Sequence, residues 1–149
     1  MYTVVVNPDR DEMLRRLRAL MSGRPEILEA YLFGSVARSS AQPHSDVDIA
    51  VYVDEAKLPD APFGYEAALS AECIKALGTN RVDVVRLNRA GPLLYHRVLR
   101  DGCRFLARDI QATTTREGYA LSRYCDYVPQ LAKLERTAAR RIRAGEFGQ

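Results

Sequence analysis

The sequence predicts one small α/β or α+β domain, in which a small mixed β-sheet is flanked by helices. Three observations predict this class, of which the first two are that apolar runs of strand length are interleaved with amphipathic helical segments and that no internal repeat is present. The third is size, because 149 residues, 47% of them hydrophobic, suffice for one core and are short for two. We therefore expect a single domain over residues 1–149.

Each element follows from local spacing. Residues 1–6 are expected to form an edge strand, and Asn7-Pro8-Asp9 resembles the start of a helix that ends at Gly23. The run ILEAYLF predicts a strand that stops at Gly34-Ser35, before a turn or short helix over 36–40. A buried strand is expected in 45–53, followed by a loop and a helix closed by Gly78. A strand over 81–87 and a helix ending at Gly102 come next. The last expected elements are a strand over 103–107 and a helical segment from Asp109. Pro129 should kink or divide that last segment.

Composition and charge indicate which classes of protein the sequence does not resemble. The net charge of +3 and the pI near 8.9 are mild, and they do not by themselves identify a nucleic-acid-binding protein. The first residues combine a short apolar run with charges, which predicts neither a signal sequence nor a membrane span, so we expect a cytoplasmic protein without a membrane partner. Cys73, Cys103 and Cys125 lack the paired spacing of a zinc site or a disulfide framework.

Three aspartates predict a metal site. Asp46 and Asp48 are two apart on a strand, so their side chains point to the same side of the sheet, and Asp83 begins the next buried strand in the same manner. Carboxylates gathered about 4 Å apart repel by roughly 4 kcal/mol per pair in a partly buried site. Such a cluster needs a cation, and hard oxygen ligands select Mg²⁺. Taken singly, each aspartate could instead cap or solubilise a strand end.

A glycine-serine turn upstream favours the metal site over that simpler interpretation. At Gly34-Ser35 a strand meets a short helix, where glycine permits close approach of the backbone and exposed amides and the Ser35 hydroxyl can hold phosphate oxygens. Arg38, about one turn later, could contact the polyphosphate or pair with a carboxylate of the site. The pattern predicts that a nucleoside triphosphate lies at this turn.

These motifs resemble a known superfamily. A glycine-serine pair, ten residues and then Asp-x-Asp, here Gly34-Ser35 and Asp46-Val47-Asp48, resembles the signature of the DNA polymerase beta nucleotidyltransferase superfamily. The segments GSVAR, SDVDIAVYV and VDVVRLNRAGPLLYHRVLRDG resemble its minimal nucleotidyltransferase branch, the MntA-type antitoxins that are paired with HEPN ribonuclease toxins. The resemblance covers a core of about 27–109, whereas the C-terminal helical segment 109–145 matches in pattern only.

The resemblance implies a polymerase-beta-like fold and a set of roles. It implies that Ser35 binds nucleotide phosphates, that Asp46 and Asp48 ligate metal, and that Asp83 completes the catalytic triad. It also implies that AMP from ATP, with two Mg²⁺ ions, is transferred to a tyrosine of a partner HEPN toxin, which neutralises the toxin. Ser39 departs from the glycine of many relatives, so the turn after Arg38 can differ in shape.

Other interpretations remain open at this stage. The chain could neutralise a toxin by binding alone, or modify a small hydroxylated molecule such as an aminoglycoside, although little sequence follows Asp109 to hold such an acceptor. His44 could approach the triphosphate or be exposed beside Pro43. Two clusters in the last helical segment favour a surface for homo- or hetero-oligomer formation over nucleic-acid binding, namely Tyr119, Tyr124 and Tyr127, and Arg136, Arg140, Arg141 and Arg143.

Overall fold

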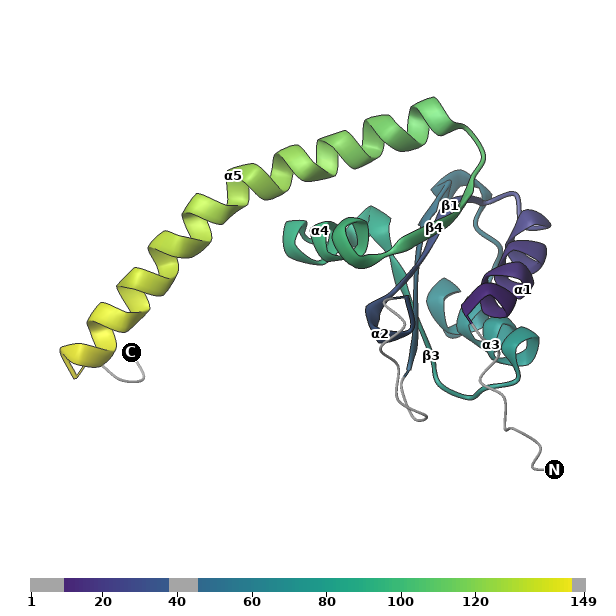
Figure 1. Ribbon diagram of the computed structural model, residues 1–149, viewed down its shortest axis with the longest axis horizontal. Helices are drawn as coiled ribbons and strands as arrows, with labels where there is room; N and C mark the ends of the chain where they lie inside the picture. The colour runs from purple at the N-terminus through teal and green to yellow at the C-terminus, as the bar shows by residue number, and fades with distance from the viewer. Residues whose placement is uncertain (1–9, 38–45, 146–149) are drawn as a thin grey trace.

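The computed structural model describes residues 10–37 and 46–145, and these form a four-stranded mixed sheet with helices on both faces (Figure 1). The strand order is β3-β2-β1-β4, in which β1 is antiparallel to β2 and β4 while β2 is parallel to β3. This confirms the predicted fold class. In chain order, the elements are α1 (Arg10–Ser22), β1 (Ile27–Phe33), α2 (Gly34–Ala37), β2 (Val47–Val53), η1 (Glu55–Lys57), α3 (Tyr65–Leu77), β3 (Val82–Arg86), η2 (Leu87–Arg89), α4 (Pro92–Asp101), β4 (Cys103–Ala107) and α5 (Ile110–Arg143).

Strand alternation divides the apolar side chains between two cores. On β2, Ile49 and Val51 face the core that α1 and α3 cover, whereas Ala50 belongs to a second core on the opposite face. The second core includes Tyr95 and Val98 of α4 and Ala120 of α5. The sheet is therefore buried on both faces along its central strands, which explains why β1 and β2 are apolar at nearly every position.

The helix ends follow the predicted local signals. Gly78 ends α3 with φ of 70°, a left-handed conformation, and its N–H donates to the carbonyl of Ile74. Asp109 begins α5, because its carboxylate accepts hydrogen bonds from the N–H groups of Gln111 and Ala112 at 3.1 and 3.3 Å. The short helices η1 and η2 were not expected from the sequence. The predicted strand over 1–6, Arg38, Ser39 and His44 lie outside the described residues.

A buried ion pair fastens α5 to the sheet. Glu29 of β1 is fully buried, and it accepts two hydrogen bonds from the Arg116 guanidinium, at 2.6 and 2.9 Å, and one from the Thr113 hydroxyl at 2.8 Å. A buried carboxylate is tolerated when charge and hydrogen bonds compensate it in this way. The first turns of α5 are thus fixed across β1, next to α4.

Tyr124 of α5 still stacks on His96 of α4, with ring centroids 3.6 Å apart, and the rest of α5 extends away from the body of the molecule (Figure 1). The prediction that Pro129 could divide this segment is wrong, because α5 is one helix of 34 residues. Pro129 is exposed, so its ring and missing N–H disturb no packed neighbour, and the helix accommodates them by curving. No helix in the described parts of the chain is both long and apolar enough to traverse a lipid bilayer.

Candidate active site

The three predicted carboxylates lie near the first residues of two parallel strands. Asp48 of β2 and Asp83 of β3 are register partners, so both side chains project from the same face of the sheet. Asp46 immediately precedes β2, where the Val47 N–H donates to the Arg81 carbonyl at 2.8 Å and fixes the start of the strand pair. Asp48 is half-buried, whereas Asp46 and Asp83 are exposed.

Burial and mutual repulsion perturb the central carboxylate. The pKa of Asp48 is raised above its ordinary value of 3.8, first by burial and then by the negative charges of Asp83 and Asp46, while the positive charge of Arg97 acts in the opposite direction. The three aspartates therefore form one electrostatic unit. A positive ligand at this end of the sheet would relieve their repulsion.

The donor chemistry fits a divalent ion. The three side chains offer carboxylate oxygens, the ligands that Mg²⁺ prefers, and solvent and phosphate oxygens can reach the exposed ones. Among the described residues, however, no three carboxylate, imidazole or thiol groups converge into a ready-made ion site. The assignment of Asp46, Asp48 and Asp83 as metal ligands stays a prediction.

The glycine-serine turn lies directly beside Asp48. Phe33, the last residue of β1, is the register partner of Asp48, and Gly34 follows with φ of 76°, which favours glycine. A Cβ atom at position 34 would overlap the Asp48 carboxylate and lie 3.1 Å from its Cγ. Gly34 thus allows α2, with Ser35, to begin against the carboxylate, as the sequence predicted.

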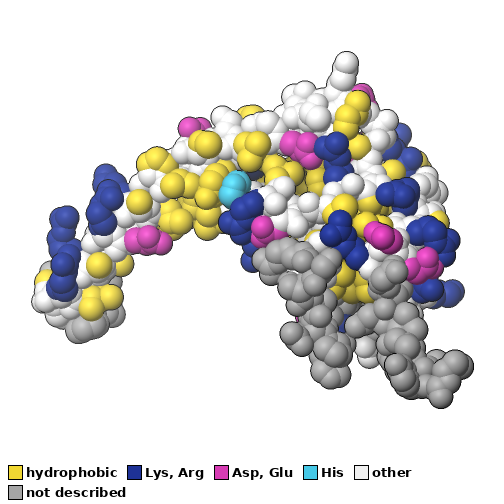
Figure 2. Space-filling view, viewed as in Figure 1, with side chains coloured by type: hydrophobic (Ala, Val, Ile, Leu, Met, Phe, Trp, Pro, Cys, Tyr) yellow, Lys and Arg dark blue, Asp and Glu magenta, His cyan; other side chains and the backbone are white. Residues whose placement is uncertain are grey.

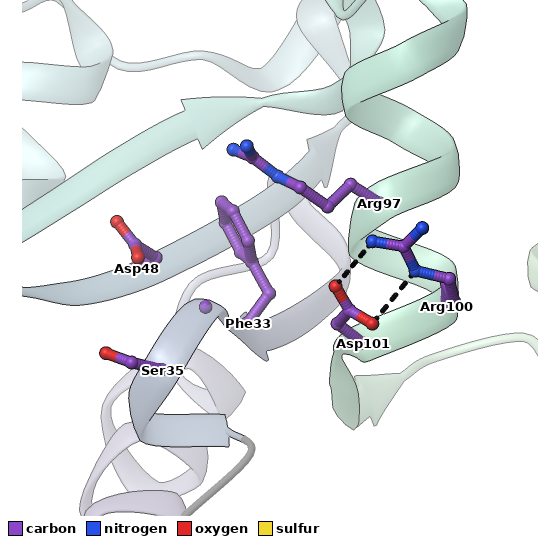
Figure 3. A pocket seen from close by; sticks show the side chains of 7 residues that line it. Phe33, Ser35, Asp48, Arg97, Arg100 and Asp101 are labelled. Carbon is purple, nitrogen blue, oxygen red and sulfur yellow. Dashed lines mark hydrogen bonds and ion pairs between the residues drawn. The ribbon is translucent and has the colours of Figure 1, made fainter. Parts of the chain in front are cut away.

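These residues open into a hollow of about 350 Å³ (Figure 3). The last residue of β1 and the first residues of β2 form its floor, and α4 forms the wall opposite Ser35. The hollow is large enough for part of a nucleotide. Its lining residues are Phe33, Gly34, Ser35, Asp48, Arg97, Arg100 and Asp101.

Sequence reasoning missed the α4 side of this hollow. It predicted the helix over this segment, but it gave no role to Arg97, Arg100 or Asp101. The available signal was the spacing of three between two arginines near the helix end, which places both on one side of α4. That spacing indicates a site only when α4 is known to return to the catalytic end of the sheet, which is a property of the fold.

Comparison with known proteins agrees with this geometry. The family model described as "Polymerase beta, Nucleotidyltransferase" matches residues 15–111, well over half of the chain. The chain belongs to this nucleotidyltransferase family. No curated protein sequence matches it.

Solved structures share the fold. A chain of a toxin-antitoxin crystal structure with AMP-PNP is 24% identical, with a TM-score of 0.66 over 89% of this nucleotidyltransferase and 99% of that chain. A chain from the complex of tri-AMPylated Shewanella oneidensis HEPN toxin with MNT antitoxin is 22% identical, with a TM-score of 0.62 over 87% and 98%. A protein described as a minimal nucleotidyltransferase is 30% identical, with a TM-score of 0.51 over 65% and 96%.

Proposed function

We propose that this nucleotidyltransferase is an antitoxin that transfers AMP from ATP to a tyrosine of a cognate HEPN ribonuclease toxin. The observation that carries the chemistry is the register pair Asp48 and Asp83, with Asp46, beside the Gly34-Ser35 turn. The choice of acceptor is supported by similarity along nearly the whole of two toxin-antitoxin chains, one from a complex with AMP-PNP and one from a complex with an AMPylated toxin.

The residues of this chain have distinct roles in the proposed reaction. Asp46, Asp48 and Asp83 would hold two Mg²⁺ ions, and Ser35 with the adjacent amides would hold phosphate oxygens of ATP. A bound divalent ion supplies positive charge at the α-phosphate and at the pyrophosphate leaving group. Arg38 is a second candidate phosphate contact, outside the described residues.

Proton transfer is assigned to Asp83. The acceptor oxygen forms a bond to the α-phosphorus while the bond from that phosphorus to the bridging oxygen of pyrophosphate breaks. The proton of the acceptor hydroxyl passes to Asp83, which is exposed and therefore accessible to a hydroxyl carried by another protein. Asp48, half-buried at the centre of the cluster, would stay an ion ligand throughout.

The toxin is proposed to bind along the extended part of α5. On the helix, the face that packs against the body near Ala120 continues outward as an apolar stripe. Leu134 and Ile142 are 63% and 57% exposed, and Figure 2 shows yellow side chains along this extension with Lys and Arg gathered toward its end. We call this surface the α5 stripe; it comprises Tyr127, Leu131, Leu134, Ala138 and Ile142.

The decisive experiment measures transfer to the candidate toxin. Purified HEPN partner is incubated with this protein, ATP and Mg²⁺, and its intact mass is determined, with Asp46→Asn/Asp48→Asn as the inactive variant. Asp60→Asn is the matched control, because Asp60 is an exposed aspartate in the loop before α3. We expect a mass gain corresponding to AMP with the wild type and Asp60→Asn only.

Two other outcomes lead to different functions. A stable complex without any mass gain indicates an antitoxin that acts by binding alone. A mass gain of the toxin that persists in Asp46→Asn/Asp48→Asn shows that the carboxylates of Asp46 and Asp48 are not needed for transfer.

A further inference from the structure

Arg97 stands out among the arginines near the candidate active site. Arg100 is paired with Asp101 through two contacts of 3.0 Å, and Arg104 is paired with Glu117 at 2.7 Å. Within the part of the chain that the structure describes, no hydrogen bond or ion pair holds the Arg97 guanidinium. The guanidinium carbon lies over the Phe33 ring, 5.9 Å from the ring centroid.

The position of this cation relative to the catalytic carboxylates is well defined. Phe33 is the register partner of Asp48, so the ring on which the guanidinium rests lies next to the central carboxylate. Figure 3 shows Arg97 reaching from α4 across Phe33 in the direction of Asp48, with Ser35 on the other side of the hollow. Arg97 also borders a second hollow, of about 290 Å³, together with Leu93 and Leu94. A ligand that occupies either hollow therefore meets the guanidinium.

The chemistry of arginine identifies the ligand. A guanidinium presents N–H donors in a planar fork that matches two oxygens of a phosphate, and stacking on an aromatic ring fixes the plane of that fork. Phe33 is buried and belongs to the second core, so it is a rigid support.

We infer that Arg97 binds a phosphate group of the nucleoside triphosphate from the α4 side and that Phe33 orients its guanidinium. The triphosphate is then held between two walls, with Ser35 on one and Arg97 on the other. This inference rests on the proposed function, because it requires a nucleoside triphosphate in the hollow. Arg97 is a binding residue in this account, and proton transfer stays with Asp83.

Equilibrium binding tests the inference without turnover. The probe is α,β-methylene-ATP with Mg²⁺, which cannot be cleaved between the α- and β-phosphates, and calorimetry gives its affinity. Loss of a charge-assisted hydrogen-bonded contact predicts that Arg97→Ala binds the probe about ten- to a hundredfold more weakly. Arg97→Lys keeps the charge but loses the fork, so its affinity should be intermediate. Inorganic pyrophosphate with Mg²⁺ should show the same order of affinities, because the contact is to phosphate.

Two further variants control the interpretation. Phe33→Leu should weaken probe binding about two- to fivefold, the size of a cation–π contribution, and its melting temperature shows whether the core is intact. Arg15→Ala on α1, whose partner is Glu12, removes an arginine from a different surface and should bind the probe as the wild type does.

The possible outcomes separate this inference from the proposed function. Unchanged probe affinity in Arg97→Ala overturns the inference and leaves the proposed function standing. If the wild type binds neither probe nor pyrophosphate, the proposed function fails together with it. If Arg97→Ala changes the affinity for Mg²⁺ alone by as much as the affinity for the probe, Arg97 acts on the metal site and the phosphate contact is overturned.

Discussion

Gly34 and Asp48 lie so close together that a hydrogen atom is the largest substituent the backbone at position 34 can carry. The contact joins the end of β1 to β2 at the point where α2 begins, and the positive φ of Gly34 makes the turn possible. The glycine of the glycine-serine motif is therefore a steric requirement of the carboxylate beside it. This explains physically why the two motifs occur together.

Replacing Gly34 with alanine should disable the site more than it destabilises the fold. The left-handed backbone should cost about 1–2 kcal/mol of stability. The added Cβ displaces the Asp48 carboxylate. A catalytic group misplaced by about 1 Å can cost about a hundredfold in rate. Gly118→Ala is the matched control, because a Cβ there meets nothing within 4 Å inside α5, and it should stabilise the protein by about 0.5–1 kcal/mol. Urea unfolding and AMP transfer are measured on both; full transfer by Gly34→Ala would contradict the steric argument.

Replacing Asp48 with asparagine should stabilise the metal-free protein at neutral pH. The pKa of Asp48 is raised in the folded state, so its protonated form favours folding below the unfolded pKa of about 3.8, and this contribution is lost as the pH rises through the folded pKa. The ionised carboxylate thus opposes folding at neutral pH. In EDTA we expect Asp48→Asn to unfold at a higher urea concentration than the wild type, with the difference shrinking as the pH falls toward 3.8.

Added Mg²⁺ provides the complementary measurement. An ion that binds only the folded protein stabilises it in proportion to the logarithm of ion concentration. The wild type should gain stability with Mg²⁺ and Asp48→Asn should gain much less. Equal gains in the two proteins would place the ion elsewhere.

The strands could be predicted from the sequence because their boundaries carry strong local signals. The apolar run of β1 is bounded by Pro25 before it and Gly34 after it, and the predicted and observed strands coincide. The acidic cluster could be predicted because two residues of one strand must share a face. Placing Asp83 in the cluster needed one further assumption, that β2 and β3 are neighbouring strands. The two strands are indeed paired, in parallel.

The α4 wall of the site could not be predicted in the same way. Whether Arg97 faces the carboxylates depends on the path of α4 across the second core, and the periodicity of the helix does not encode that path. Local reasoning also left open whether Pro129 kinks α5 or divides it, and the structure shows one continuous helix. Proline is costly inside a packed helix, but an exposed position on an extended helix lets the backbone bend toward solvent.

The pair of Glu29 and Arg116 should carry much of the stability that holds α5 on the sheet. Removing one partner leaves a buried charge uncompensated, so Arg116→Ala should lower the free energy of unfolding by about 3–5 kcal/mol. The double variant Glu29→Leu/Arg116→Leu should recover part of that loss, because no unpaired charge is left. The exposed pair of Arg15 and Glu12 is the control, and Arg15→Ala should change stability little. Similar losses in Arg116→Ala and Arg15→Ala would show that the buried pair does not fasten α5.

Charge introduced into the α5 stripe should weaken binding of the proposed toxin partner while leaving the enzyme folded and able to bind nucleotide. Leu134→Glu and Ile142→Glu place a carboxylate on an exposed apolar surface, so the melting temperature should not change. Burying that carboxylate in an interface is costly, and we expect the toxin to bind at least about tenfold more weakly. Arg140→Gln shifts the net charge by the same amount on the opposite face of the helix, and it should bind normally. Calorimetry with the HEPN partner distinguishes the surfaces: if Arg140→Gln weakens binding and the stripe variants do not, the toxin contacts the basic face of α5.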